Sequence, residues 1–287
     1  MANENDTTLN SELFVNLLAD SRYAAAETSV ARQLTSVFNV AKGQSKTVQI
    51  PVWAAVSASN PGESTAFTAA ETNTTSSTIT MDEYGVYHQV TDLLADSVAN
   101  NVFDQLGEAS GRAMAEKIDQ ICWATFSSFT GGTVGGSGQE LTLDLILKAA
   151  ATLKSGKVPG PYYAVVDPRE AYNLKNEIGA VGGSTNNRGG LAGSDLQNRV
   201  LNGYFIGTVA GVEIFESSLI TEDSAEAMTQ GVFAPSAIGL AFRGEMEMET
   251  QRQAAKRATD VVMKQTMGAA AIQPTHGVKL ITERVID

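Results

Sequence analysis

Apolar residues recur at intervals of three or four between Asp92 and Phe129, which is the period of one face of an α-helix. The apolar positions are Leu94, Val98, Val102, Leu106, Ala109, Ala113, Ile118, Ile121 and Phe126. Acidic residues crowd the first turns, where the helix dipole favours them, and glycines follow at 131 and 132. The pattern predicts a helix roughly 55 Å long, which needs other parts of the chain packed along it.

The chain before this helix begins with an arm. Residues 1–9 are polar, and from Asn10 to about Phe38 the apolar positions again have helical spacing. The pattern predicts an amphipathic N-terminal arm over residues 1–45, which packs on its own lobe or on another chain.

Two alternating stretches, 46–53 and about 77–90, predict the strands of a long hairpin over residues 46–91. Pro51 cannot donate a ladder hydrogen bond, so its strand is expected at an edge or in a two-stranded ribbon. The tip is polar, and an isolated hairpin is marginal in water. We therefore expect the hairpin to contact another subunit.

After the helix, the glycine-rich stretch 131–138 predicts a flexible linker and a lobe boundary. Helix and strand patterns then alternate over residues 139–240, which is typical of an α/β lobe. The expected elements are a helix over 141–153, a strand over 162–167, a helix from Pro168 to Gly179, a glycine-rich loop over 179–195, a strand hairpin of 203–209 and 212–216, and a strand over 232–242.

The C-terminal segment alternates again from Arg243 onward, with further strands expected over 259–267 and 277–282. These strands are predicted to form one antiparallel sheet against the long helix. The expected organisation is an arm (1–45), a hairpin (46–91), a unit formed by 92–138 with 241–287, and the α/β lobe (139–240).

The net charge of −12 argues against a nucleic-acid binder, which would show a basic face. No lysine or arginine occurs between Thr47 and Gly111, so this part is either a solvated acidic surface or one that meets a basic partner. The single cysteine, Cys122, excludes an intrachain disulfide and is expected to be a buried small hydrophobe. No apolar run is long enough to span a membrane, and the acidic N-terminus is unlike a signal peptide.

Candidate chemistry is sparse. The two histidines, His88 and His276, do not lie in a nucleophile motif, and the glycines of 179–195 do not form a phosphate-binding motif. The acids of the last segment lack the ligand spacing of a calcium loop. Ion pairs are therefore expected between Glu245, Glu247 and Glu249 and the bases Arg243, Arg252, Lys256 and Arg257. No catalytic, cofactor-binding or metal-binding residue is predicted, and an enzyme on the 139–240 lobe, a hydrolase or nucleotide-binding enzyme, remains the alternative of a different class.

The element order, together with the stretches Tyr163–Pro168, Val209–Phe215 and the alternating tail from Arg243, resembles the major capsid proteins of tailed double-stranded DNA bacteriophages. The resemblance implies the α+β Hong Kong 97-type capsid fold. In that fold residues 46–91 would be the extended E-loop, 139–240 the A-domain, and the long helix with the closing sheet the P-domain.

The resemblance also implies a function and partners. Many copies of the chain, as hexamers and pentamers, would form an icosahedral shell that encloses DNA without sequence-specific binding and without a membrane. A portal, a separate scaffolding protein and a decoration or cement protein are the expected partners. The location would be the virion, after assembly in the bacterial host cytoplasm, and an encapsulin-like nanocompartment shell is the alternative within the fold. Because the hairpin has no lysine after Lys46, no isopeptide cross-link is expected from it.

Charge patterning adds a hypothesis about contacts between subunits. The acids of one hairpin would meet basic residues on the arm, helix and closing sheet of a neighbour. The contact residues are Glu63, Glu71, Arg22, Arg32, Arg112, Lys117, Arg252 and Arg257. The resemblance places a loop at a five- or six-fold axis, with Gly182, Gly183, Asn187, Arg188 and Gly189 in it.

Overall fold

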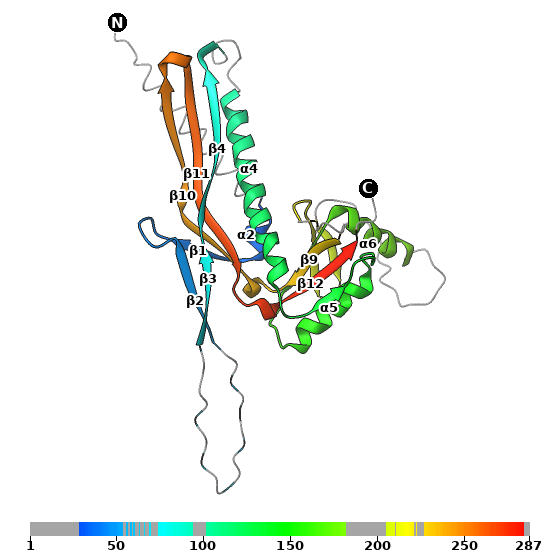
Figure 1. Cartoon of the computed structure of the whole chain (residues 1–287). Helices are drawn as coiled ribbons and strands as arrows, with labels where there is room; N and C mark the ends of the chain where they lie inside the picture. Colours follow the sequence, from blue (N-terminus) through cyan, green and yellow to red (C-terminus); the bar gives the residue numbers. More distant parts are fainter. Residues whose placement is uncertain are drawn as a thin grey trace.

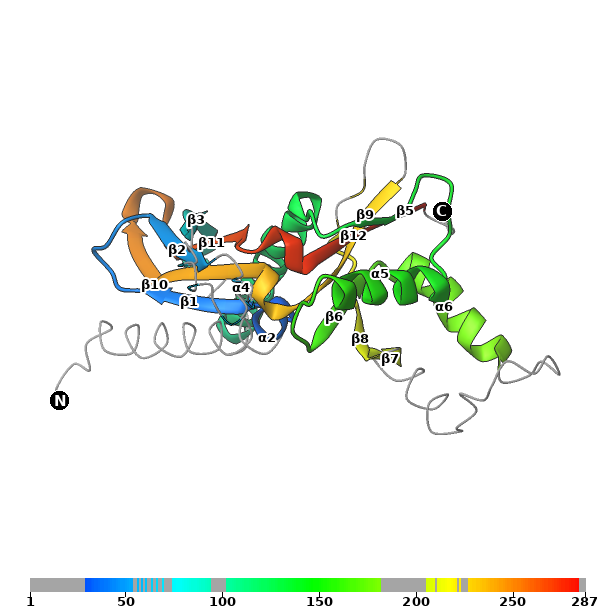
Figure 2. The same ribbon diagram turned by 90° about the horizontal axis from the view of Figure 1, so that it is seen from below.

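The computed structural model of the chain shows an elongated body, a lobe beside it and a hairpin that projects away from both (Figure 1). Seen from below, the body and the lobe lie end to end (Figure 2). The residues that the structure describes are 29–53, 74–93, 102–181, 205–209, 211–220, 222 and 227–283, with isolated residues between 56 and 69.

The body is one long helix on one sheet. The four strands are, in spatial order, β1 (Ser36–Val40), β10 (Ile238–Gln253), β11 (Ala258–Ala271) and β4 (Asp82–Thr91). Helix α4, Val102–Ala124, lies along this sheet and is roughly 35 Å long at 1.5 Å per residue (Figure 1). Its buried face, with Met114, Ile118 and Cys122, packs against apolar side chains of β10 and β11 in one core cluster.

Strands β10 and β11 form the long hairpin that carries the body. Their register runs from Ile238 opposite Ala271 to Gln253 opposite Ala258, with a shift between residues 243 and 247. Gly244 lies at this shift with φ +71°, a left-handed conformation that favours glycine. The shift changes which side chains of β10 face the core, so Met246 is buried while Glu245 is exposed.

The ends of the predicted helix and arm differ from the expectation. The structure describes the helix from residue 102, and a 3₁₀ turn, Thr125–Ser128, closes it just before Phe129, as expected. The prediction that the arm stays helical to Phe38 was wrong. A short helix, α2 (Ala31–Leu34), is followed by β1, which pairs in parallel with β10 because that strand needs a backbone partner at its edge.

The projecting hairpin consists of β2 (Thr47–Trp53) and β3 (Thr74–Thr80), which pair only with each other. This confirms the two-stranded ribbon expected from Pro51. The prediction of one strand through residue 90 was wrong, because the chain breaks at Met81 and β4 pairs with β11 instead. The buried positions shift phase there, from odd numbers at Ile79 and Met81 to even numbers in β4.

The lobe is a six-stranded mixed sheet with two helices. In spatial order the strands are β5 (Thr133–Gly135), β12 (Gly277–Glu283), β9 (Ala227–Phe233), β6 (Tyr162–Val166), β8 (Val212–Glu216) and β7 (Phe205–Val209). Helices α5 (Leu143–Ser155) and α6 (Pro168–Val181) bury Ile146, Ala150 and Leu174 in the core cluster of this lobe. The strand before Pro168, the helix that starts there and the β7–β8 hairpin agree with the sequence prediction.

Two predictions about the lobe were wrong. The stretch 131–138 is not a flexible linker, since Thr133–Gly135 pairs with β12. A Cβ atom on Gly131 would lie 2.4 Å from the Thr275 carbonyl oxygen, so this glycine permits close backbone approach. Strand β12 was expected in the closing sheet of the body, but it pairs with β5 and β9 in the lobe.

The chain also crosses between the sheets earlier than expected. The predicted strand over 232–242 is two strands, because Pro235 opens a 3₁₀ turn, Pro235–Ala237, between β9 and β10. Proline fixes φ and lacks the N–H that a continuous strand would need. The boundary of the lobe therefore falls at this turn and not at residue 240.

A cluster of aromatic rings joins the body to the lobe. Trp123, Phe126 and Phe129 at the end of α4 contact Phe233 of β9, with ring centroids 5.6 to 6.4 Å apart between Phe233 and the other three. Gly231 lies beneath Phe126, where a Cβ atom would be 2.6 Å from the ring. The side chain of Trp123 also donates a hydrogen bond to Ser217 at 3.0 Å.

Candidate assembly surfaces

The projecting hairpin presents exposed apolar and acidic side chains. Trp53 is 68% exposed and Val56 is 58% exposed, and Glu63 is exposed near the tip. On the opposite face of β2 from Trp53, the half-buried Val48 and Ile50 pack against the buried side chains at the root of the hairpin, which include Ile79 and Met81. The hairpin is thus held at its root, and those residues farther out that the structure describes are exposed.

Six of the sequence-predicted contact residues can be located. Glu63, Arg32, Arg112, Lys117, Arg252 and Arg257 lie within the described residues. Glu71, Arg22 and the predicted axis-loop residues Gly182, Gly183, Asn187, Arg188 and Gly189 lie outside the described part of the chain. The located residues do not form one patch; they are distributed over the hairpin, α2, α4 and the end of the β10–β11 hairpin.

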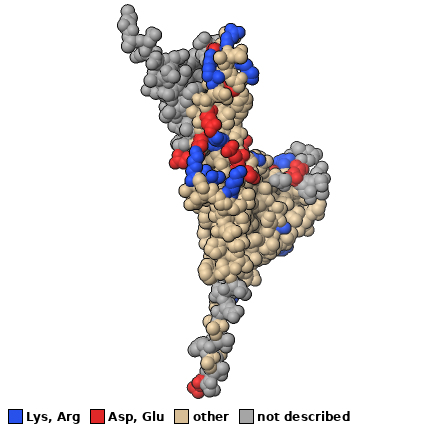
Figure 3. Space-filling view, turned by 60° about the vertical axis from the view of Figure 1, so that its left-hand side comes forward, with Lys and Arg blue, Asp and Glu red and all other residues tan. Residues whose placement is uncertain are grey.

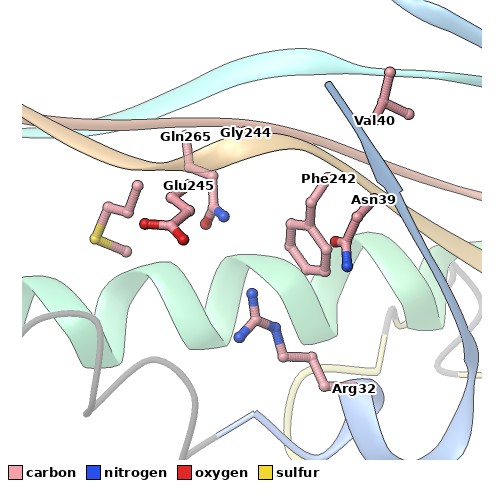
Figure 4. A pocket seen from close by; sticks show the side chains of 8 residues that line it. Arg32, Asn39, Val40, Phe242, Gly244, Glu245 and Gln265 are labelled. Carbon is pink, nitrogen blue, oxygen red and sulfur yellow. The ribbon is translucent and has the colours of Figure 1, made fainter. Parts of the chain in front are cut away.

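Arg32 lies in a hollow of about 560 Å³ rather than on an open face. Its guanidinium carbon lies 4.3 Å from the centre of the Phe242 ring, and Figure 4 shows it pointing toward that ring. The Nε atom is buried and has no hydrogen-bond partner among the described residues. Burial lowers the pKa of Arg32, and Glu245 and Gln265 line the same hollow.

The two arginines on the helix and the closing sheet form ion pairs within the subunit. Arg112 pairs with Glu108 one turn away on α4. Arg252 pairs with Asp92 through both guanidinium nitrogens, one of them at 2.7 Å. Figure 3 shows lysine and arginine at the end of the body that carries this hairpin, and a mixed band of both charges lower on the body.

Lys117 and Arg257 form no ion pair with any described residue. The Lys117 ammonium lies 5.3 Å from the centre of the Tyr84 ring and donates a hydrogen bond to Gln120 at 2.9 Å. Arg257 directly follows the 3₁₀ turn Ala254–Lys256 and has a left-handed backbone conformation with φ +47°. Neither base is therefore held in an ion pair by a described carboxylate, and the charge of Arg257 acts on Asp92 only from a longer distance.

The row of glutamates on β10 pairs with other bases than the sequence suggested. Glu247 pairs with Lys42, and Glu249 pairs with Lys264 on the neighbouring strand. The prediction named Arg243, Arg252, Lys256 and Arg257 as partners and was wrong for Glu247 and Glu249. Lys264 lies on the adjacent strand β11 and Lys42 follows the adjacent strand β1, and side chains on neighbouring strands lie close together.

The histidines form serine contacts but no triad. His88 Nε2 lies 2.8 Å from Ser110 Oγ, and His276 Nδ1 lies 2.7 Å from Ser236 Oγ. Among the described residues neither histidine has a hydrogen bond to a carboxylate, and burial lowers the pKa of His276. Across the same residues no group of three or more potential metal ligands occurs, and no helix is long and apolar enough to span a membrane.

Asp119 was not predicted as a functional residue, but it holds the arm. Its buried carboxylate accepts hydrogen bonds from the Ser29 hydroxyl at 2.7 Å and from the backbone N–H groups of Val30 and Ala31 at 3.2 and 3.0 Å. Burial raises the pKa of Asp119 in spite of these donors. The sequence does contain a signal for Asp119: it is an acid next to Ile118, on the apolar face of the predicted helix.

Glu170 is a second buried acid that the sequence analysis missed. It is fully buried in the first turn of α6, where Thr282 of β12 donates a hydrogen bond to its Oε2 atom. Its Oε1 atom and Gln230 Oε1 are both buried without a hydrogen-bond partner among the described residues. Burial, aided by the negative charge of Asp167, raises the pKa of Glu170 to about 7, against hydrogen bonds from Thr282 and Gln230 and the charge of Arg169. Glu170 shares a helix face with Leu174, which was the available signal.

Comparisons with known proteins identify the family. The family model described as phage capsid protein matches residues 74–280, more than half of the chain. No curated protein matches the sequence at a significant level.

Solved structures of phage capsids share the fold. The capsid of cyanophage P-SCSP1u has a TM-score of 0.67 at 18% identity, covering 89% of this chain and 88% of that one. Mycobacterium phage Che8 has a TM-score of 0.63 at 20% identity, with 83% and 85% covered. The capsid of Ralstonia phage GP4 has a TM-score of 0.67 at 9% identity, with 88% and 86% covered. The chain belongs to the phage capsid protein family, has the Hong Kong 97-type fold, and is a major capsid protein, the structural protein of the virion that forms the head shell.

Proposed function

We propose that copies of this chain, arranged as hexamers and pentamers, form a closed icosahedral shell around the double-stranded DNA of the phage, and that the chain has no enzymatic activity of its own. The net charge of −12 supports this proposal, since a shell that gripped DNA strongly would hinder packaging.

The projecting hairpin is the observation that carries the proposal. Among the described strands, β2 and β3 pair only with each other, and the hairpin extends beyond the body (Figure 1). Two-stranded hairpins are marginal in water and need a surface to lie on. In a shell that surface is a neighbouring subunit, so the projecting hairpin of β2 and β3 would act as the E-loop. The six-stranded lobe would be the A-domain, and α4 with the four-stranded sheet of the body would be the P-domain.

Charge supports a contact between this hairpin and a neighbour. Glu63 or Glu71 would pair with a base on the next copy, and Lys117 and Arg257 form no ion pair with a described residue of their own chain. Arg112 and Arg252 could exchange their partners on assembly, and Arg22 and Arg32 complete the set. One exposed pair contributes only ~0–1 kcal/mol, but a shell repeats it in every subunit.

The test is a charge reversal of the hairpin, Glu63→Lys with Glu71→Lys. We expect slower assembly and a changed salt dependence while the subunit remains folded, because the pairs become repulsive. The matched control is Glu140→Lys with Asp144→Lys, which makes the same charge change at exposed positions of the lobe. If the hairpin variant and the control assemble alike, the acidic hairpin is only a solvated surface.

The remaining partners are part of the same proposal. A portal at one vertex, a separate scaffolding protein and a decoration or cement protein would act with the shell, which assembles in the host cytoplasm. The loop with residues 182–189 would face the symmetry axis of each capsomer. Electron cryo-microscopy of purified particles tests this: DNA and one portal vertex support a phage head, whereas an enzyme cargo would indicate an encapsulin-like compartment.

A further inference from the structure

A groove of about 650 Å³ lies where the end of α4 meets the end of β11. Its wall is a face of α4 and the following 3₁₀ turn, and its floor is formed by two half-buried alanines, Ala269 and Ala271, on the face of β11 that packs toward α4. The side chain of Ala270 between them lies on the other face of the sheet, in the cluster with Ile79. The complete lining is Tyr84, Lys117, Gln120, Ile121, Ala124, Thr125, Ser128, Ala269, Ala270, Ala271 and Pro274. The groove therefore combines small apolar side chains with a single charge, that of Lys117.

The hairpin carries a side chain that suits such a groove. Trp53 is 68% exposed at the outer end of β2, and Val56 beyond it is 58% exposed. An exposed indole of this kind is unusual, and tryptophan is the side chain most enriched at the centres of protein interfaces. The hairpin points away from its own body, so its own groove does not cover Trp53 (Figure 1).

Charge selects this groove among the hollows of the described surface. The hairpin has acids and no base between Thr47 and Gly111. Each of three other hollows contains at least one acid: Glu245 beside Arg32 in one, Glu249 and Asp260 in the second, and Glu108 and Glu116 beside Arg112 in the third. The alanine-floored groove contains none, and Lys117 gives it the complementary sign.

We propose that Trp53 of one copy inserts into the alanine-floored groove of a neighbouring copy, and that this is the apolar anchor of the shell contact. The proposal rests on the proposed function, because it assigns the partner of the hairpin in a shell of identical copies. The indole would lie on Ala269 and Ala271, and the Lys117 ammonium, already 5.3 Å from the Tyr84 ring, would lie between two aromatic rings. The acidic pairs of Glu63 and Glu71 then form the rim around this anchor.

Cysteine cross-linking tests the contact directly. The variant Trp53→Cys with Ala269→Cys is assembled at a raised subunit concentration, which offsets the loss of the indole, and is then mildly oxidised. We expect a ladder of covalently linked subunits in shells and none in unassembled subunits. The native Cys122 is fully buried, so it does not contribute. The control is Trp53→Cys with Ala151→Cys, since Ala151 is exposed on the lobe helix α5.

A second variant separates the anchor from the shell function. Trp53→Ser, which changes only an exposed side chain of the free subunit, should raise the subunit concentration needed for assembly about tenfold or more. Ala269→Leu, which fills the groove from its floor, should do the same. The inference is overturned if wild-type shells form, the Trp53→Ser variant assembles normally, and the 53–269 pair links no more than the control. If the wild-type chain forms no shells, the proposed function itself fails.

Discussion

The buried acid of the lobe, Glu170, makes the stability of the subunit depend on pH. Its carboxyl group is 0% exposed and its pKa is raised from 4.5 to about 7, mainly by burial. The folded state therefore binds this proton between pH 4.5 and 7, where the unfolded chain has released it. The contribution of Glu170 to stability is complete below about pH 4.5 and is lost as the pH rises through about 7.

The size of the effect follows from that displacement. At about 1.36 kcal/mol per pKa unit, the change from 4.5 to about 7 corresponds to roughly 3 kcal/mol in the free energy of unfolding. The surroundings explain why the neutral form is favoured. Two oxygens of this site, Glu170 Oε1 and Gln230 Oε1, are buried without a hydrogen-bond donor, and a protonated Glu170 brings an O–H donor to it. The negative charge of Asp167 also disfavours the carboxylate form of Glu170.

The assay is urea unfolding of unassembled subunits between pH 5 and 8, followed by the fluorescence of Trp123, which is hydrogen-bonded to the lobe. Glu170→Gln keeps a neutral side chain of the same length, so we expect the variant to lose most of this pH dependence and to exceed the wild type in stability at pH 8. Glu140→Gln, an exposed acid of the same lobe, is the control. Parallel pH profiles for wild type and Glu170→Gln would refute the reasoning.

Three further predictions concern buried positions. Gly231→Ala should destabilise the subunit by about 1–3 kcal/mol in urea unfolding, because its Cβ would lie 2.6 Å from the Phe126 ring; a wild-type midpoint would disprove the clash. Asp119→Ala should cost at least about 2 kcal/mol, because the Ser29 hydroxyl and two backbone N–H groups lose their acceptor, and should speed proteolysis of the arm; an unchanged digestion rate would contradict this. Cys122 should react with a thiol reagent at pH 8 only after unfolding, since burial raises the pKa of its thiol; rapid labelling of the folded subunit would show otherwise.

Local pattern was a good guide to the elements and a poor guide to their partners. The helical period located α4 and its end near Phe129, and Pro51 identified a two-stranded ribbon. Alternation likewise identified β12, but it does not say which strand lies alongside. The long-range pairing with β5 and β9 placed β12 in the lobe, and only the three-dimensional arrangement contains that information.

The candidate site divides in the same way. Charge counting identified the acidic hairpin and the bases, because these properties depend on residue type alone. It did not show that Arg32 lies against Phe242 or that Arg252 is paired with Asp92, which depend on distances across the fold. Asp119 and Glu170 are single acids in apolar faces, and a linear pattern does not distinguish a buried acid from one at the margin of a face.

Glycine misled the sequence analysis in one place, and the correction changes where the subunit can adapt. The glycines of 131–138 were expected to form a hinge between lobes, but Gly131 donates backbone hydrogen bonds to the carbonyls of Pro274 and Gly277, and Thr133–Gly135 is a strand of the lobe. The two lobes also share the buried aromatic cluster around Phe233, and rotating one against the other would separate its rings from their neighbours. The projecting hairpin contributes no ring to this cluster, and within the described part of the chain its strands β2 and β3 pair with each other alone. Subunits at non-equivalent positions of a shell should therefore differ mainly in the conformation of the hairpin, which is also the part proposed to contact the neighbour.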